Sequence, residues 1–354
     1  MKSAAEDDAS PKTESGLKTW GIETMALGIS LGGAPHTERF TRMMEWVELA
    51  EQINLHSVWL PEMHFAPGVN ASPLTLLAAV ARRTTRVRLG TTSLLLPIHH
   101  PLRIAHDVAT LDHLSQGRVL LGLGRGFRAA LFAAFGLDPS TKRNRFDQAL
   151  DLMLDRWAGR TMELQGTPFE DVPLALREAS SQPFQRPHPP LAVAAFGRKG
   201  LEQAARRALP YLASPLEPFE LIRENLQFHQ EKMSESGRTA TPVVPIMRTV
   251  FISDQPQTLN EAMNTLKNEN PPPRPGTKLP LALSRAMAAP LEDRVVLGDV
   301  AEVTARLKHY QKELGMNLLV VRPEIGGVSL PELRESIMQL HREVIPALSD
   351  AARR

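Results

Sequence analysis

The sequence predicts an α/β protein built as a (β/α)8 TIM barrel, in which parallel strands alternate with helices. Short apolar runs alternate with longer segments whose apolar residues recur at helical spacing, which is the pattern of βα units. Eight such units can be distinguished, the number that closes a barrel. A chain of 354 residues with 42% hydrophobic residues is large enough to bury the core of one such domain.

The first half of the chain is expected to supply four strands, at residues 25–31, 57–60, 87–96 and 119–123. Their helices are expected at residues 38–52, 73–83, 101–117 and 144–157. Pro73 and Pro101 stand at the first helical turn, where a missing backbone N–H has no cost. The fourth strand is apolar throughout, as expected for a strand covered on both faces.

The second half is expected to supply strands at residues 191–195, 211–213, 243–252 and 318–321. Helices are expected at residues 200–207, 218–233, 299–314 and 330–348. A polar, proline-rich insertion follows the helix after strand four and extends to Pro190. Residues 268–290 are proline-rich and too long for a simple connection, so we expect a mobile lid after strand seven. Because strands five and six are weak, a doubly wound open sheet is the alternative fold.

The N-terminal residues and the composition lead to expectations about domain bounds, location and binding partners. Residues 1–20 are rich in charged and small polar side chains and are expected to form a disordered tail, with one domain over 21–354. The chain has no cysteine, so it gives no indication of an oxidising compartment, and a cytoplasmic location is expected. A net charge of +2 with scattered arginines gives no indication of nucleic-acid binding, and no apolar run is long enough for a membrane span.

The residues that follow each strand are the candidates for function, because the active site of such a barrel lies at the carboxyl ends of its strands. Glu62 and His64 follow strand two. Gly124 and Arg125 follow strand four, and the segment Gly197, Arg198 and Lys199 follows strand five. Glycine allows a backbone to approach a phosphate closely, and arginine or lysine supplies the charge, so both segments predict anion binding. The alternative is that these glycines only relieve crowding at the strand end.

Two further patterns follow strands three and four. His99 and His100 are adjacent, and adjacent extended residues point in opposite directions, so we expect no metal site there. One histidine is expected in the pocket and the other in packing. The glycines near Arg125 do not form a dinucleotide fingerprint, because Phe127 stands where the third glycine is required.

Three segments carry a resemblance to a known family: residues 58–65, 89–101 and the block LDHLSQGRVLLGLGRGFR at 111–128. They resemble the bacterial-luciferase-like flavin-dependent monooxygenases, and the similarity extends over about residues 25–348. The resemblance implies that reduced FMN and O2 oxygenate a small organic substrate through a flavin C4a-peroxide. It also implies a separate flavin reductase and a homodimer.

The resemblance assigns roles to residues of this chain. Arg125, preceded by Gly124, corresponds to the family's arginine near the flavin phosphate, and Gly197, Arg198 and Lys199 correspond to its second phosphate loop. A non-proline cis peptide beneath the flavin ring is implied between Thr92 and Ser93. His64 is the candidate general acid or base, with Glu62 as its polar neighbour, and its alternative is a structural histidine near the barrel mouth.

The chain departs from the luciferases proper at two positions. Met63 stands where they have a histidine that takes part in chemistry, and a thioether cannot transfer protons. Gly124 stands where they have a cysteine. Both departures favour an oxygenase that does not emit light.

The surroundings of the flavin are expected from the same segments. Its pocket is expected to be lined by apolar side chains, each of which could alternatively be plain core: Trp59, Phe65, Leu94, Leu96 and Phe127. The substrate loops are expected at residues 34–39, 66–71 and 128–134. A deazaflavin-dependent hydride transferase and a non-catalytic flavin-binding protein are the alternative functions.

Overall fold

The computed structural model describes residues 11–32, 39–65, 70–161, 164–167, 170, 182–239, 241–271 and 279–352. Its centre is a parallel sheet with strand order β6-β5-β4-β3-β2-β1-β9-β7-β8. The strands are β1 (Ala26–Ser30), β2 (Ser57–Leu60), β3 (Arg88–Leu95), β4 (Val119–Gly124), β5 (Leu191–Ala194), β6 (Tyr211–Leu212), β7 (Pro245–Ile252), β8 (Val295–Gly298) and β9 (Leu318–Arg322).

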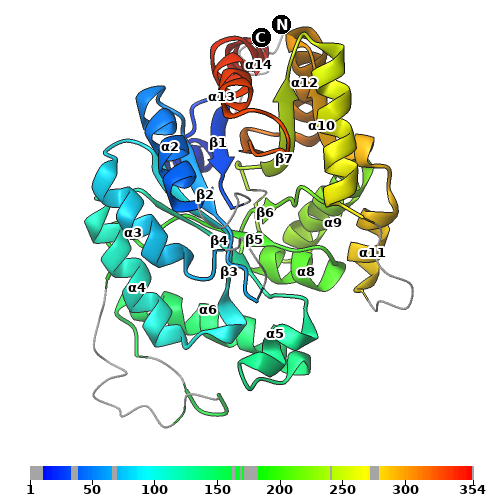
Figure 1. Cartoon of the computed structure of the whole chain (residues 1–354). Helices are drawn as coiled ribbons and strands as arrows, with labels where there is room; N and C mark the ends of the chain where they lie inside the picture. The colour runs from blue at the N-terminus through cyan, green and yellow to red at the C-terminus, as the bar shows by residue number, and fades with distance from the viewer. Residues whose placement is uncertain are drawn as a thin grey trace, which may run out of the picture.

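Helices surround this sheet, with α2 to α4 on one side and α9 to α12 on the other (Figure 1). The helices of the first half are α1 (Pro11–Trp20), α2 (Arg39–Gln52), α3 (Pro73–Arg83), α4 (Pro101–Leu114), α5 (Ala129–Ala134) and α6 (Lys142–Ala158). Those of the second half are α8 (Arg198–Arg206), α9 (Phe219–Glu235), α10 (Pro256–Glu269), α11 (Leu281–Ala288), α12 (Val300–Leu314), α13 (Leu330–Gln339) and α14 (Ile345–Ala352). No helix in the described ranges is both long and apolar enough to cross a membrane.

The sheet curls until its β6 end meets β7. Ala213 lies just after β6. Its backbone N–H donates to the carbonyl oxygen of Pro245 at 3.1 Å, and its carbonyl oxygen accepts the N–H of Met247 at 3.0 Å. The eight expected strands correspond to β1–β7 and β9, which follow one another around this curled sheet. β8 was not expected from the sequence, and it pairs in parallel with the last four residues of β7.

Alternating residues of the strands face the interior of the curled sheet, where Trp59 is the largest side chain. Trp59 is completely buried and packs with Leu120, Leu212 and Val320 of other strands. A Cβ added to Gly90 on the neighbouring strand would lie 2.1 Å from the indole, so glycine makes the space for this ring. The opposite strand faces form a second, larger core against the helices.

The expectation of a disordered tail over residues 1–20 was wrong for its second half. Residues 1–10 lie outside the described residues, but Pro11–Trp20 forms α1. Trp20 and Ile22 are buried against Val243 and Leu318, at the amino ends of strands, and His56 Nε2 lies 2.8 Å from the Trp20 carbonyl oxygen. The local composition is polar, but the two apolar side chains gain burial by covering this end of the sheet.

The two irregular segments expected in the second half were only partly described. Residues 171–181 and parts of 162–169 in the expected insertion lie outside the described residues, as do residues 272–278 of the expected lid. The rest of the lid region is regular, because Leu281–Ala288 forms α11 beside α9 (Figure 1). Arg285 of α11 pairs with Glu224 of α9 at 3.1 Å. Helix α5 after β4 was also not expected.

Candidate functional site

The carboxyl ends of β1, β3 and β4 bring three of the expected site residues together. The peptide bond between Thr92 and Ser93 is cis, as the resemblance implied, and the β3–β4 register shifts at this point. The Thr92 hydroxyl lies 3.2 Å from the Ser30 hydroxyl. A Cβ on Gly124 would lie 2.0 Å from Ser93 Oγ, so the backbone of β4 approaches the Ser93 side chain as closely as glycine permits.

Glu62 lies beside these residues and is the centre of a second group. Its Oε1 is 2.8 Å from His64 Nε2 and 2.7 Å from His99 Nε2, and its Oε2 accepts the backbone N–H of Leu95 at 2.6 Å. The Glu62 side chain has no exposed surface. Three residues from two strand ends therefore hold one buried carboxyl group in a fixed position.

The hydrogen bonds decide the charge of Glu62. Burial alone would raise the pKa of its carboxyl group, but the bonds from His99, Leu95 and His64 outweigh burial and hold the pKa below its ordinary value. An ionised carboxylate only accepts hydrogen bonds, so both histidines donate from Nε2. The neutral form of each ring therefore has its lone pair on Nδ1, the atom that can accept a proton.

Arg125 lies against the first turn of α8, although the two are far apart in sequence. Its Nη1 donates to Gln203 Oε1 at 3.1 Å, and a Cβ on Gly200 would lie only 2.2 Å from its Nη2. The N-cap of α8 is Gly197. The guanidinium and the amino-terminal backbone N–H groups of α8 therefore adjoin each other, and both attract anions.

The charges around Arg125 also favour an anion. Burial and the nearby Arg143 lower the pKa of Arg125, while Asp147 raises it. Burial, Arg125 and Arg143 in turn lower the pKa of Lys142. Asp147 pairs with Arg207 at 2.7 Å, and within the described ranges Arg125 forms no ion pair of its own. An anion bound here would relieve the repulsion among these cations.

The other two residues of the expected phosphate loop are arranged differently. Arg198 and Lys199 are both exposed at the start of α8. The Arg198 guanidinium lies over the Phe228 ring of α9, 4.5 Å from its centroid. The backbone turn from Gly197 to Gly200, rather than the Arg198 side chain, is therefore the part of this loop that adjoins Arg125.

The expected apolar lining separates into two groups. Trp59, Leu94 and Leu96 are fully buried core residues, so the expectation that they line the pocket was wrong. Trp59 packs in the interior of the curled sheet, whereas Leu94 and Leu96, at the end of β3 and just after it, belong to the larger core against the helices. Phe65 and Phe127 are exposed, by 73% and 41%, and the structure adds Phe135 of the α5 end at 41%. Phe135 meets the His64 ring edge-on with centroids 5.2 Å apart, so aromatic surface surrounds His64.

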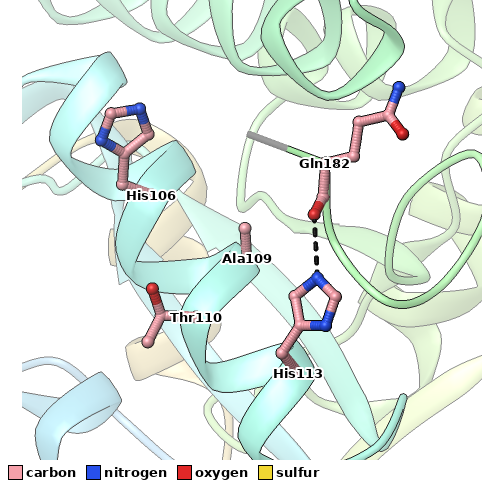
Figure 2. Close-up of a pocket in the computed structure, with 5 residues that line it drawn as sticks. All are labelled: His106, Ala109, Thr110, His113 and Gln182. Carbon is pink, nitrogen blue, oxygen red and sulfur yellow. Dashed lines mark hydrogen bonds between the residues drawn. The ribbon is translucent and has the colours of Figure 1, made fainter. Parts of the chain in front are cut away.

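Two further features of the described residues bear on other possible sites. A surface hollow of about 320 Å³ between α4 and Gln182 is lined by His106, Ala109, Thr110 and His113 (Figure 2). It lies on the outer side of a helix, away from the strand ends, and His113 in it bonds the Gln182 carbonyl oxygen at 3.1 Å. Across the described part of the chain, no group of three acidic, histidine or cysteine side chains is arranged to hold a metal ion.

The expected substrate loops are described only in part. Residues 34–38 and 66–69 lie outside the described residues, whereas residues 128–134 comprise Arg128 and helix α5. Arg128 is exposed and lies over the Phe127 ring at 5.7 Å. The described part of the expected substrate region therefore has an exposed arginine next to an exposed aromatic ring.

Comparison with known proteins identifies the family. The family model described as luciferase-like monooxygenase matches residues 24–317. The chain belongs to the luciferase-like monooxygenase family. It is 26% identical to the oxygenase component of flavin-dependent trigonelline monooxygenase from Acinetobacter baylyi over 333 residues, 88% of this chain and 91% of that protein.

Solved structures share the fold of this chain. The oxygenating constituent of 3,6-diketocamphane monooxygenase from Pseudomonas putida, in complex with FMN, superposes with a TM-score of 0.72 and 18% identity, covering 92% of this chain and 99% of that chain. The coenzyme F420-dependent tetrahydromethanopterin reductase from Methanopyrus kandleri does so with a TM-score of 0.64 and 18% identity, covering 92% and 100%. At this identity the likeness concerns the fold alone.

Two residues of the site were missed or left undecided by sequence reasoning. His99 was one of an adjacent histidine pair, and the sequence did not show which ring faces the site; the structure places His99 on Glu62 and His100 at the N-cap of α4. Gln203 gave no signal, because a glutamine in the middle of a helix has no distinguishing pattern. Its role depends on α8 packing against the end of β4.

Proposed function

We propose that this protein is a flavin-dependent monooxygenase that uses reduced FMN and O2 to oxygenate a small organic substrate. The observation that carries the proposal is Arg125, a half-buried cation without an ion pair in the described structure, set against the glycine-rich first turn of α8. That arrangement fits the phosphate of a flavin mononucleotide. Reduced FMN, when bound, supplies the reactivity toward O2.

The residues of this chain have three tasks in the proposed reaction. Arg125 and the α8 turn bind the phosphate and so orient the flavin, while the carboxyl ends of β3 and β4 support it at Ser93 and Gly124. The aromatic residues around His64 exclude water from the reacting atoms. His64 Nδ1 accepts or returns a proton, because its Nε2 is occupied by Glu62.

The supply of the reduced flavin is also part of the proposal. The sequence has no dinucleotide fingerprint for a nicotinamide, so we propose a separate flavin reductase, an arrangement that the name "oxygenase component" indicates for the Acinetobacter relative. A homodimer and a cytoplasmic location belong to the same proposal and rest on the family resemblance and on the absence of cysteine.

Substitution of Arg125 tests the cofactor site directly. Arg125→Ala should weaken FMN binding by about 1.5–3 kcal/mol, roughly 10- to 150-fold in Kd, because a charge-assisted contact is lost. The matched control is Arg103→Ala, since Arg103 lies exposed on α4 and, among the described residues, forms its ion pair with Asp107. Affinities would be measured by fluorescence titration or calorimetry. Equal affinity in the wild type and Arg125→Ala would remove the phosphate assignment.

Turnover separates the proposed function from its alternatives. With a flavin reductase present, O2 uptake and product formation would be followed across a panel of aldehydes, ketones and sulfonates. Oxygen-dependent product supports the monooxygenase. Anaerobic turnover with a reduced deazaflavin would instead identify a hydride transferase, and FMN binding without conversion of any substrate would identify a non-catalytic flavin-binding protein.

A further inference from the structure

We propose that His99 is a positioning residue of this enzyme, which fixes the Glu62 carboxylate and, through it, the ring orientation and proton affinity of His64. The proposal rests on the proposed function, because it concerns the acid–base group of that reaction. It adds a residue from the segment after β3 to a pair that the sequence placed after β2 alone.

The geometry of the carboxylate supports this role. His64 and His99 both reach the same oxygen, Oε1, at 2.8 and 2.7 Å, while Oε2 is held by the Leu95 N–H at 2.6 Å. Leu95 and His99 flank the turn η1 (Leu96–Ile98), so the segment after β3 binds both oxygens of Glu62. The carboxylate therefore cannot rotate without breaking a bond to this segment.

Sharing one oxygen couples the two rings. Each imidazole donates Nε2–H to the same carboxylate, and one negative charge balances one imidazolium. Because both rings contact Glu62 Oε1, we expect protonation of one ring to disfavour protonation of the other. The charge state of His99 thus sets how readily His64 accepts a proton.

A positively charged side chain also contacts the turn that precedes His99. Arg145 of α6 donates to the Pro97 carbonyl at 2.9 Å within the same turn, and it lowers the pKa of the neighbouring His100, second to burial. Glu62 is the acidic group that both rings contact. The His99 side chain is 28% exposed and that of His64 is 12%, so His99 is the ring with more direct access to solvent protons.

Two substitutions separate the hydrogen bond of His99 from its charge. Glutamine in His99→Gln can still donate an N–H toward Glu62 but does not titrate, whereas His99→Leu neither donates nor titrates. The control is His113→Gln, because His113 lies on α4 away from the strand ends. Full-length proteins would be compared, and thermal unfolding would verify that each is folded.

The first readout is the pH titration of the His64 ring by NMR of protein labelled on histidine, which needs neither cofactor nor substrate. We expect coupled steps in the wild type and in His113→Gln, and a single step for His64 in His99→Gln. In His99→Leu the His64 midpoint should move by half a pH unit or more. A His64 titration curve that is the same in wild type, His99→Gln and His99→Leu would overturn the proposal.

The second readout is kinetic. We expect His99→Leu to lower kcat at least tenfold with KM and FMN affinity nearly unchanged, and His99→Gln to recover most of kcat while one limb of the pH–rate profile is lost. Loss confined to KM would overturn the positioning role. A wild-type protein without oxygen-dependent turnover would contradict the proposed function instead, and the NMR titration would still decide the coupling of His99 to His64.

Discussion

At the scale of single residues, Glu217 is the most unusual group outside the proposed site. It is completely buried just after β6 and accepts hydrogen bonds from Tyr211 Oη at 2.5 Å, Asn225 Nδ2 at 2.7 Å and the Ser214 N–H at 2.7 Å. Arg248 of β7 donates to the Glu217 backbone carbonyl at 2.8 Å. Burial raises the pKa of the Glu217 carboxyl group to about 7, against these hydrogen bonds, which lower it.

This shift predicts a pH dependence of stability. Because the pKa of Glu217 is higher in the folded state, its proton stabilises the fold. This contribution is complete below pH 4.5, the ordinary pKa of the group, and is lost as the pH rises through about 7. The wild type should lose about 3 kcal/mol of unfolding free energy from this group across that window. Glu217→Gln should flatten the dependence, as measured by urea unfolding between pH 4.5 and 8.

The control for this prediction is Glu292→Gln, because Glu292 is exposed on the surface and pairs with Lys267. It should retain the pH dependence of the wild type. Parallel stability curves for wild type and Glu217→Gln would show that the Glu217 carboxyl group does not titrate between pH 4.5 and 7.

At the scale of elements, the spacing of β2 and β3 depends on one large and one absent side chain. Trp59 on β2 crosses over Gly90 on β3, and its Nε1 donates to Ser57 Oγ at 2.7 Å. The indole is thereby held by a hydrogen bond as well as by packing. The strand ends that carry Glu62 and Thr92 follow directly from these two strands, so this contact sets the distance between them.

Gly90→Ala should therefore destabilise the fold by about 1–3 kcal/mol, since the added methyl group overlaps the indole. Trp59→Leu should also destabilise it, by opening a cavity. The double variant should lose less than the sum of the two, because the smaller side chain makes room for the alanine. Chemical unfolding of all four proteins measures this, and additive losses would mean that the two positions do not interact.

At the scale of the whole molecule, α1 covers the amino-terminal end of the curled sheet, opposite the proposed active site. Leu17, Trp20 and Ile22 pack onto the interior cluster that contains Trp59. A Cβ on Gly16 would lie 2.6 Å from Pro242, so the helix sits close against the segment before β7. The interior core is thus continuous from α1 to the strands that carry the site.

Trp20→Ala should accordingly cost about 3–5 kcal/mol of unfolding free energy, as for removal of a buried tryptophan from a core. Leu281→Ala is the matched control, because Leu281 is 80% exposed and its loss should change stability by less than about 0.5 kcal/mol. Thermal or urea unfolding would compare the two. A Trp20→Ala protein as stable as Leu281→Ala would show that α1 is dispensable to the core.

The sequence by itself determined the order of the eight principal strands and the segments that carry the proposed site. Apolar runs such as 119–123 and the periodic helices between them are local patterns, and burial imposes them wherever the strand lies in the sheet. Gly124 and Arg125, like Glu62 and His64, were found because each pair is contiguous or nearly so. β8 and α11 were not predicted, because short elements contain too few residues for a periodic pattern of apolar side chains to be recognised.

Only the tertiary structure decided which of these segments meet. Arg125 reaches Gln203, 78 residues away, and Glu62 reaches His99, 37 residues away, through the parallel pairing of strands and the packing of α8. Only the tertiary structure showed that the polar segment Pro11–Trp20 forms a helix that covers the core. It also showed that Trp59 is buried whereas Phe65 is exposed. Strand register and helix packing fix these contacts, and neither leaves a pattern in the neighbouring residues from which it could be inferred.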